Sequence, residues 1–173
     1  MKADAKRQQL IDKLVDHVLA HGLPNASLRP LAAAAGTSDR MLIYYFTDKA
    51  TLIAAILQAG AARMAAALEA ATGPERRPVV QLSRELHALV RTDAFWPYMK
   101  LWVEMVALAA QGDAVCRSVG EAVARGFIVW IAARIDVPEV ERDLAAQRLL
   151  RDVDASALLH AVGLDDVVTA LAP

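Results

Sequence analysis

Residues 27–49 of the chain read SLRPLAAAAGTSDRMLIYYFTDK. The pattern predicts two short apolar helices, from Leu28 to Ala35 and from Asp39 to Tyr45, with Gly36 between them. Two short helices that meet at a steep angle need a residue that tolerates positive φ at the turn and a small residue at their contact. Gly36 and Ala32 meet these requirements. The spacing therefore predicts a helix-turn-helix, whose second helix can lie in a major groove of DNA.

The second of these helices is expected to have one buried and one exposed face. Leu42 is expected to lock it against the first helix, and Leu31, Ala35 and Tyr45 are assigned to the same inner side. The three consecutive aromatic residues 44–46 cannot all face one side of a helix, so at least one is exposed. An exposed ring beside basic side chains is typical of a nucleic-acid contact. The alternative is a helical hairpin in an ordinary bundle, with these rings in its core.

The rest of the chain has the composition and periodicity of a helical protein. Hydrophobic residues make up 56% of the 173 and charged residues 23%, which excludes a disordered chain. Apolar side chains recur at helical spacing between glycines, prolines and capping residues. The residues expected to cap the helices that follow them are Ser27, Ser38 and Thr47-Asp48. Further helices are expected at 4–21, 49–71, 78–91, 94–111, 114–135 and 139–162, with a short terminal helix starting over 163–165 and a loop at 72–78. The predicted fold class is all-α.

The residues around the predicted turn have a specific order. Gly36-Thr37-Ser38 is followed by three further positions, by Leu42-Ile43-Tyr44-Tyr45-Phe46, and two positions later by Lys49. This order resembles the TetR family of bacterial regulators, whose pattern runs Gly-x-Ser, three variable positions, Leu-Tyr-x-Tyr-Phe, two positions and Lys. The resemblance covers about residues 8–57. Ile43 departs from it, because it stands where the family usually has a tyrosine that helps to contact DNA.

The resemblance implies two domains and a regulatory function. Residues 1–48 would form an N-terminal three-helix helix-turn-helix DNA-binding domain, and residues 49–173 a C-terminal helical ligand-binding and dimerisation domain. The implied function is that of a sequence-specific DNA-binding transcriptional regulator, specifically a repressor that a small apolar ligand releases from its operator.

Individual contacts to DNA also follow from the resemblance. Tyr45 and Lys49 match positions that grip backbone phosphates, whereas Asp39, Arg40 and Tyr44 match positions that face bases. An arginine can bond to guanine through two parallel hydrogen bonds, which are worth ~1–3 kcal/mol of discrimination. The whole set of expected DNA contacts is Ser27, Arg29, Thr37, Ser38, Asp39, Arg40, Ile43, Tyr44, Tyr45 and Lys49.

The C-terminal part concentrates most of the large aromatic and flexible side chains. Such side chains line apolar small-molecule pockets well, and His87 or Glu104 would be a polar anchor in one. Trp102 and Met105 are expected to lie nearest to the ligand. For each residue taken alone, the alternative is plain core packing. The expected ligand-binding residues are His87, Trp96, Met99, Trp102, Met105, Phe127 and Trp130.

If the chain binds DNA through this helix-turn-helix module, we expect it to be a homodimer. One small module contacts only a few base pairs, whereas two-fold pairing places two half-sites ~34–36 Å apart on a palindromic operator. The helices expected at 114–135 and 139–162 resemble the pair through which family members dimerise, but their apolar stripes also fit an intramolecular core. These stripes are Val119, Val123, Phe127 and Ile131 on the first helix, and Leu149, Leu150, Val153, Leu158 and Leu159 on the second.

Charge and cysteine content bear on partners and compartment. The net charge is -1, but residues 1–60 have seven basic and five acidic side chains, so a mildly basic N-terminal part precedes an acidic body. Cys116 is the single cysteine and cannot form an intrachain disulfide. No secretory segment and no unbroken apolar run of ~20 residues is visible. We therefore expect a cytoplasmic protein with no membrane partner.

Catalytic and metal-binding patterns are not found in the sequence. His17 and His21 have the i, i+4 spacing of metal ligands but lack a nearby third ligand, so no metal site is expected. A nucleophile elbow, a phosphate loop and a dinucleotide fingerprint are all missing, so neither an enzyme nor a cofactor is expected. The alternative function is an all-α ligand-binding or protein-interaction module that does not read DNA. Salt-dependent DNA binding distinguishes the two.

Overall fold

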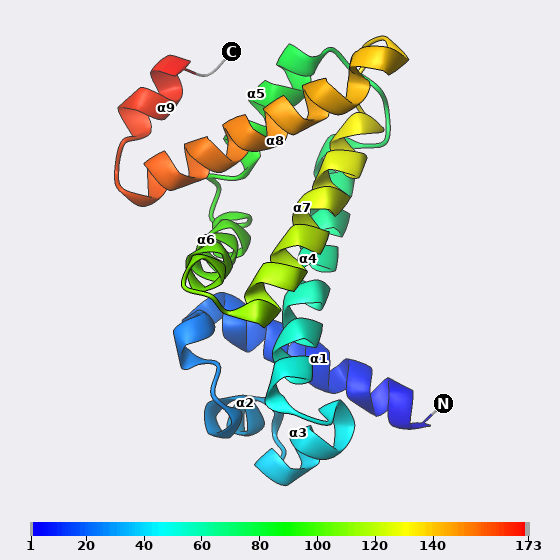
Figure 1. Cartoon of the computed structure of the whole chain (residues 1–173), viewed down its shortest axis with the longest axis vertical. Coiled ribbons are helices and arrows are strands. Elements are labelled where there is room, and N and C mark those ends of the chain that lie inside the picture. Colours follow the sequence, from blue (N-terminus) through cyan, green and yellow to red (C-terminus); the bar gives the residue numbers. More distant parts are fainter. Residues whose placement is uncertain (1, 172–173) are drawn as a thin grey trace. The chain divides into compact units, whose positions relative to one another are not determined.

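The computed structural model describes residues 2–171, and these residues are predominantly helical (Figure 1). The helices follow the order that the sequence predicts, with one additional short 3-10 helix, η1. The all-α prediction is confirmed. The elements are α1 (Lys2–His21), η1 (Leu23–Asn25), α2 (Leu28–Ala35), α3 (Asp39–Phe46), α4 (Lys49–Thr72), α5 (Val79–Leu89), α6 (Trp96–Ala110), α7 (Ala114–Ala132), α8 (Glu139–Ala161) and α9 (Asp165–Leu171).

The helix predicted to reach residue 135 ends earlier, because its last residues pair with the loop that follows α4. α7 ends at Ala132. The backbone N–H of Arg77 donates to the carbonyl of Arg134 over 3.0 Å, and the N–H of Asp136 donates to the carbonyl of Arg77 over 2.9 Å. These two bonds form an isolated parallel bridge between Arg77 and Ile135. Backbone groups satisfied in this way cannot also extend the helix.

The first of two compact units joins the residues up to Met64 with Lys100–Gly120. In this unit α1 packs against α2, and α2 packs against α3. Arg63 of α4 donates to the carboxylate of Asp16 over 2.5 Å, which ties α4 to α1. Because helices of eight residues are too short to be stable alone, burial of their apolar faces must hold α2 and α3. The most deeply buried side chains of this core are Leu14, Val15, Val18, Leu31, Leu42, Phe46, Leu52 and Ile56.

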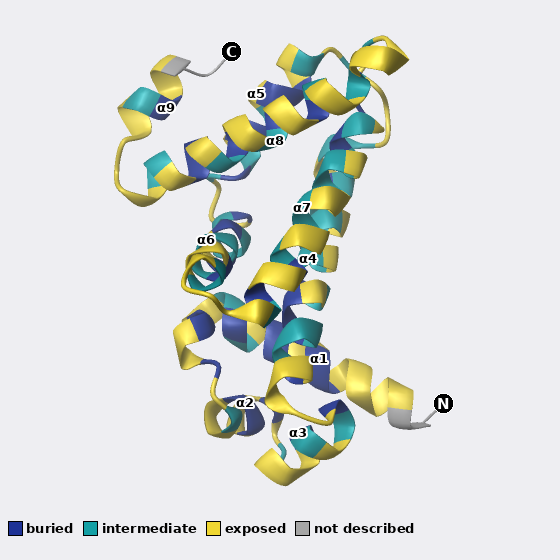
Figure 2. Ribbon diagram, viewed as in Figure 1, coloured by how far each residue is buried: buried dark blue, intermediate teal, exposed yellow. Residues whose placement is uncertain are grey.

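The second unit joins Ala65–Met99 with the residues from Glu121 onward. α5 lies along α8, and α8 packs against α9. Figure 2 shows buried residues at intervals along α5 and α8, with exposed residues between them. This alternation is expected of amphipathic helices that share one core. The buried side chains there include Leu82, Leu86, Ile135, Ala146 and Leu149.

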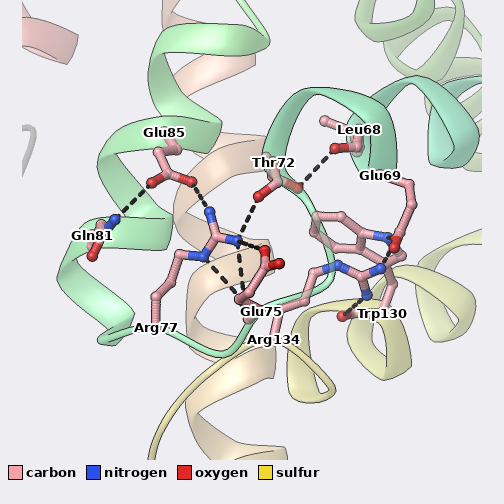
Figure 3. A network of polar contacts seen from close by, with 9 residues as sticks. All are labelled: Leu68, Glu69, Thr72, Glu75, Arg77, Gln81, Glu85, Trp130 and Arg134. Atoms are coloured by element: carbon pink, nitrogen blue, oxygen red, sulfur yellow. Dashed lines mark hydrogen bonds and ion pairs between the residues drawn. The ribbon is translucent and has the colours of Figure 1, made fainter.

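Arg77 fixes the loop that the sequence predicts at 72–78 (Figure 3). Its Nη1 donates to Glu85 Oε2 and its Nη2 to the carbonyl of Thr72, each over 2.5 Å. Gln81 also donates to Glu85, over 3.0 Å. Hydrogen bonds between charged groups are about twice as strong as neutral ones. The Arg77 guanidinium therefore joins the end of α4 to the middle of α5.

A second arginine joins the ends of α4 and α7 (Figure 3). Arg134 is 8% exposed; it forms an ion pair with Glu69, and its guanidinium lies 4.1 Å from the centre of the Trp130 ring. The Trp130 indole N–H donates to Glu69 Oε2 over 3.3 Å. Burial lowers the pKa of Arg134, because removal from water disfavours the charged form. These contacts hold the end of α4 against the end of α7 and the residues that follow it.

α4 is the one helix of the described residues that is long and apolar enough, by length and composition, to cross a membrane. Its mean hydropathy reaches 1.5 although it has no long unbroken run of large apolar residues, because alanine raises the mean. Core helices of soluble proteins pass the same test. In α4 the buried residues are Leu52, Ile56, Leu57, Gly60 and Leu68, and the others are half-buried or exposed.

The two compact units do not divide the chain at a single position. α4, α6 and α7 each contribute residues to both units. The predicted functional boundary between residues 48 and 49 is a different kind of division, which falls at the turn between α3 and α4. That boundary stays a prediction.

Candidate nucleic-acid interface and ligand site

The turn between α2 and α3 has the geometry that a helix-turn-helix requires. Gly36 ends α2 in the left-handed conformation, with φ 68° and ψ 41°. The N–H of Thr37 donates to the carbonyl of Ala32 over 2.9 Å, and the N–H of Gly36 donates to Ala33 over 3.1 Å. These bonds satisfy carbonyls at the end of α2, as glycine-terminated helices commonly do. The predicted role of Gly36 is therefore confirmed.

The caps of the two short helices differ. Ser38 precedes α3, and its hydroxyl accepts a hydrogen bond from the N–H of Met41 over 3.3 Å, as the sequence predicts. Ser27 occupies the corresponding position before α2 but makes no side-chain capping bond. Its backbone carbonyl instead accepts the first helical bond, from Leu31 over 3.1 Å. The expected Ser27 side-chain cap is therefore not formed.

α3 presents a buried face and an exposed face. Leu42 and Phe46 are 0% and 1% exposed, whereas the Tyr44 side chain is exposed and Tyr45 is half-buried. The two tyrosine rings meet edge to face, 5.3 Å apart. Phe46 is thus the core aromatic of residues 44–46, and a bundle core that holds all three rings is excluded.

Most of the predicted DNA contacts are exposed. They come from three places that are close in sequence: the start of α2, the α2–α3 turn with α3, and the start of α4. Ile43, which departs from the family pattern, is half-buried and so is available for packing as well as for an apolar base contact. The exposed members are Ser27, Arg29, Ser38, Asp39, Arg40, Tyr44 and Lys49, and the half-buried members are Thr37, Ile43 and Tyr45.

The turn from α3 to α4 brings Lys49 to a helix N-terminus. Thr47 ends α3 with φ 69°, a conformation that a β-branched residue rarely adopts. The Asp48 carboxylate accepts a hydrogen bond from the N–H of Thr51 over 2.7 Å, and this bond lowers the pKa of Asp48. Asp48 thus caps α4 as predicted. Lys49, the first residue of α4, is exposed and places a cation beside backbone N–H groups that favour an anion.

Two basic side chains of α1 support the module and were missed by the sequence analysis. The Arg7 guanidinium lies 4.8 Å from the centre of the Phe46 ring at the end of α3. Lys13 Nζ donates to the carbonyl of Ala35, the last residue of α2, over 3.5 Å. Both contacts join residues that are far apart in sequence, so helical periodicity gives no signal for them.

A cavity of about 570 Å³ lies in the second unit, between α5, α8 and α9. Of the residues predicted to bind a ligand, it includes His87, which is 6% exposed. His87 Nδ1 lies 2.7 Å from the carbonyl of Ser83 and 3.3 Å from the Ser83 hydroxyl. A carbonyl only accepts, so Nδ1 carries a proton in this contact and Nε2 of the neutral ring is the acceptor. The cavity is lined by Val79, Val80, Ser83, His87, Ala145, Arg148, Leu149, Asp152, Ala155, Ser156, Leu159 and Val168.

The other predicted ligand contacts do not line this cavity. Trp102 and Met105 belong to the first unit, and a Cβ added at Gly120 would lie 4.0 Å and 3.8 Å from them. They are absent from the lining of this cavity, and clustering in the sequence of α6 does not reveal which face of that helix meets which neighbour. A ligand contact at any of these residues stays a prediction.

Three aromatic residues that were predicted to bind a ligand lie in the second unit: Trp96, Phe127 and Trp130. Trp96 meets His160 edge to face, with ring centres 4.4 Å apart. Trp130 belongs to the cluster with Glu69 and Arg134 described above. Phe127 is half-buried, as is Trp96, and Met99 is 3% exposed. The Trp130 ring thus contacts Arg134 through its face, and its indole N–H donates to Glu69.

The apolar stripes proposed for dimerisation are only partly buried within the chain. Val119 and Ile131 of α7 are 4% and 2% exposed, and Leu149 and Val153 of α8 are 2% and 7% exposed. Leu158 is 53% exposed, and the half-buried members are Val123, Phe127, Leu150 and Leu159. Other apolar residues of the same helices are exposed instead. They are Val129, Val140 and Leu144.

Comparisons with known proteins agree with this geometry. Residues 16–56 match the model of the family "Bacterial regulatory proteins, tetR family". The HTH-type transcriptional regulator BetI of Ectopseudomonas mendocina (strain ymp) is 29% identical over 119 residues, which are 65% of this chain. The match spans 59% of that relative's length.

Solved structures extend the likeness to the whole fold. The multidrug binding protein EbrR, solved with ethidium, is 26% identical with a TM-score of 0.67, and the match covers 97% of this chain and 99% of that one. A protein of Streptomyces coelicolor A3(2), described as a transcriptional regulator, is 19% identical with a TM-score of 0.73 and 96% coverage of both chains, and it shares the fold. Residues 16–56 therefore have the sequence of the TetR-family DNA-binding module, and the chain as a whole is similar to transcriptional regulators that share this module and fold.

Proposed function

We propose that this protein is a homodimeric repressor that binds a palindromic operator through α3 and leaves it when a small, largely apolar molecule binds in the second unit. The observation that carries the proposal is the exposed face of α3 and the start of α4. Arg40, Tyr44 and Lys49 are exposed there, while Leu42 and Phe46 of the same segment are buried. A rigid helix with basic and aromatic side chains on its free face suits a major groove.

The DNA contacts divide into two groups by chemistry. Arg40 would bond to guanine, Asp39 would accept from cytosine or orient Arg40, and Tyr44 would contact a neighbouring base. Ile43 would pack on a thymine methyl group. Phosphates would be held by the remaining predicted contacts, because hydroxyl and ammonium donors position a protein on the duplex without reading its sequence. These are Ser27, Arg29, Thr37, Ser38, Tyr45 and Lys49.

Dimerisation would use the exposed apolar side chains of α7 and α8. Val129 is 69% exposed, Val140 92% and Leu144 51%, and large aliphatic side chains gain about 1.5–3 kcal/mol each on full burial. A two-fold axis through this surface would present two copies of α3 to successive major grooves. Such a dimer acts on DNA, and we propose a cytoplasmic location for it.

The ligand site that we propose is the cavity between α5, α8 and α9. Its apolar lining suits an apolar molecule, and His87 with Ser83 offers a polar anchor inside it. The EbrR structures with ethidium, proflavin and imidazole support the proposal that a chain of this fold takes a small molecule. Binding would weaken operator affinity only as far as the ligand prefers one of two conformers of the dimer.

The test is selection of bound duplexes from a random pool by the purified protein, followed by affinity measurements at two salt concentrations. An enriched inverted repeat with half-sites one helical turn apart is expected, together with affinity that falls steeply with salt. Weak, salt-sensitive binding without enrichment would contradict the proposal. It would favour a ligand-binding or protein-interaction module that no longer reads DNA.

A further inference from the structure

A carboxylate from α6 lies at the turn between α1 and α2. The backbone N–H of Leu23, the first residue of η1, donates to Glu104 Oε2 over 2.7 Å. Groups at the start of a helix have no partner within it, so they need one from outside. A carboxylate that accepts from such an N–H makes a charge-assisted bond, which is about twice as strong as a neutral one. Glu104 therefore caps η1 from a helix 81 residues away in sequence. The expectation that Glu104 anchors a ligand stays a prediction.

Gly22 shows how closely the carboxylate approaches this turn. A Cβ added at Gly22 would lie 2.6 Å from Glu104 Oε1 and 2.9 Å from Oε2, closer than real Cβ atoms come. The φ of Gly22 is +79°, which side-chain-bearing residues rarely adopt. Glycine at this position thus permits both the turn and the contact with Glu104.

α6 meets the DNA-binding helices at a second point, three residues before Glu104. A Cβ added at the buried Gly60 of α4 would lie 3.7 Å from Leu101 Cδ2 and 3.9 Å from Val15 Cγ1. Leu101 is therefore close to α4, and Val15 of α1 borders the same point. Residues three apart lie on the same face of a helix. One face of α6 consequently contacts η1 through Glu104 and lies close to α4 through Leu101.

We propose that Glu104 is a positioning residue for DNA recognition, whose carboxylate holds the α1–α2 turn and thereby the helix-turn-helix that follows it. This proposal rests on the proposed function, because it requires that α3 reads DNA. Sequence-specific binding needs α3 held at a fixed place in the groove, whereas non-specific binding depends mainly on phosphate charge. Loss of the Glu104 contact will therefore weaken specific binding far more than non-specific binding.

The experiment compares the full-length wild type with Glu104→Ala, Glu104→Gln and a matched control, Glu121→Ala. Glu121 is an exposed carboxylate of α7 that pairs with Arg125 of its own helix. Hydrogen exchange at the Leu23 amide reports the contact itself. Affinity is measured for a duplex recovered by selection and for a duplex of random sequence.

In both measurements the wild type should show the slowest exchange at Leu23 and the tightest binding of the selected duplex. Glu104→Gln should be intermediate, and Glu104→Ala should show the fastest exchange and the weakest binding. The glutamine keeps an acceptor oxygen but loses the charge, so its hydrogen bond is weaker. For Glu104→Ala we expect faster exchange at Leu23 and about tenfold weaker binding of the selected duplex, within the usual range of coupling between sites. Binding of the random duplex should not change, and Glu121→Ala should match the wild type.

Unchanged Leu23 exchange, or changed exchange with wild-type affinity for the selected duplex, would overturn the proposal. If Glu104→Ala does not fold, Glu104→Gln decides by the same two measurements. If the wild type itself selects no duplex, the proposed function fails and the positioning role falls with it. The exchange data would then show separately whether the contact exists.

Discussion

The helix-turn-helix and the second unit differ in the sequence separation between the residues that interact. In residues 27–49, the turn, the helix contact and the exposed face are all set by neighbours within a few positions. In the second unit, the cavity joins Ser83 and His87 of α5 to residues of α8 more than 50 positions later. A helix-turn-helix can therefore be predicted from the spacing of residues in the sequence. A cavity cannot be predicted in this way, because it depends on which helix faces pack against each other.

The largest effect that tests this comparison concerns the two faces of α3. Leu42→Ala should destabilise the protein by about 3 kcal/mol, because it removes a fully buried side chain and leaves a cavity. Tyr44→Ala on the exposed face should leave the free energy of unfolding nearly unchanged and weaken DNA binding. Urea unfolding measures the first effect. Equal destabilisation by both variants would show that Tyr44 belongs to a core.

The next effect separates base reading from phosphate binding on the same exposed surface. Arg40→Ala should lose about 1–3 kcal/mol of preference at one base pair and leave binding to other sequences little changed. Lys49→Ala should weaken binding to every duplex and lower the slope of affinity against salt by about one. Binding titrations on single-base variants of the selected operator measure both. If both variants weaken specific and random duplexes alike, the assigned roles are wrong.

A smaller effect is expected at the polar cluster of the second unit. Glu69→Ala should cost about 1.5 kcal/mol, because it removes the ion pair of the buried Arg134 and the acceptor of the Trp130 N–H. The matched control is Glu75→Ala. The Glu75 side chain is more exposed than that of Glu69, and its Oε2 lies 3.9 Å from Arg77 Nη2. Exposed pairs contribute about 0–1 kcal/mol. Denaturant unfolding that ranks the two variants in the opposite order would contradict the described role of this cluster.

The smallest effect is a pH dependence at the start of α4. The N–H of Thr51 lowers the pKa of Asp48 below its usual value, so the ionised form is stabilised in the folded state. This stabilisation is present above the unfolded-state pKa of about 4 and is lost as the pH falls through the lower folded-state pKa. The stability difference between wild type and Asp48→Ala should therefore shrink below about pH 4. A difference that stays constant during acid titration of unfolding would count against the cap.

The sequence predicted most of the fold and part of the site. Gly36, Ser38 and Asp48 act at their own turns, so their positions and roles could be predicted from spacing. The contacts of Arg7 with Phe46 and of Glu104 with Leu23 could not, because they join distant segments. The same limit explains the apolar stripes of α7 and α8. Periodicity identified them, but it does not tell a core face from a dimer face.

The most direct test of the central claim is DNA cleavage by an iron chelate attached to α3. A cysteine replaces Tyr44, which is 76% exposed, and Cys116 is replaced by serine to leave one reactive thiol. Cys116 is a weak competitor in any case, because burial raises the pKa of its thiol to about 11. Gln147→Cys, at an exposed position of α8, carries the same chelate as the control.

If α3 lies in the major groove of a dimer-bound operator, the Tyr44→Cys conjugate will cut the selected duplex in two clusters. Their centres will be ~10–10.5 base pairs apart, one turn of the double helix. The Gln147→Cys conjugate will leave this region uncut. Diffuse cleavage by the Tyr44→Cys conjugate, or the same pattern from both conjugates, would contradict the assignment of α3 as the recognition helix.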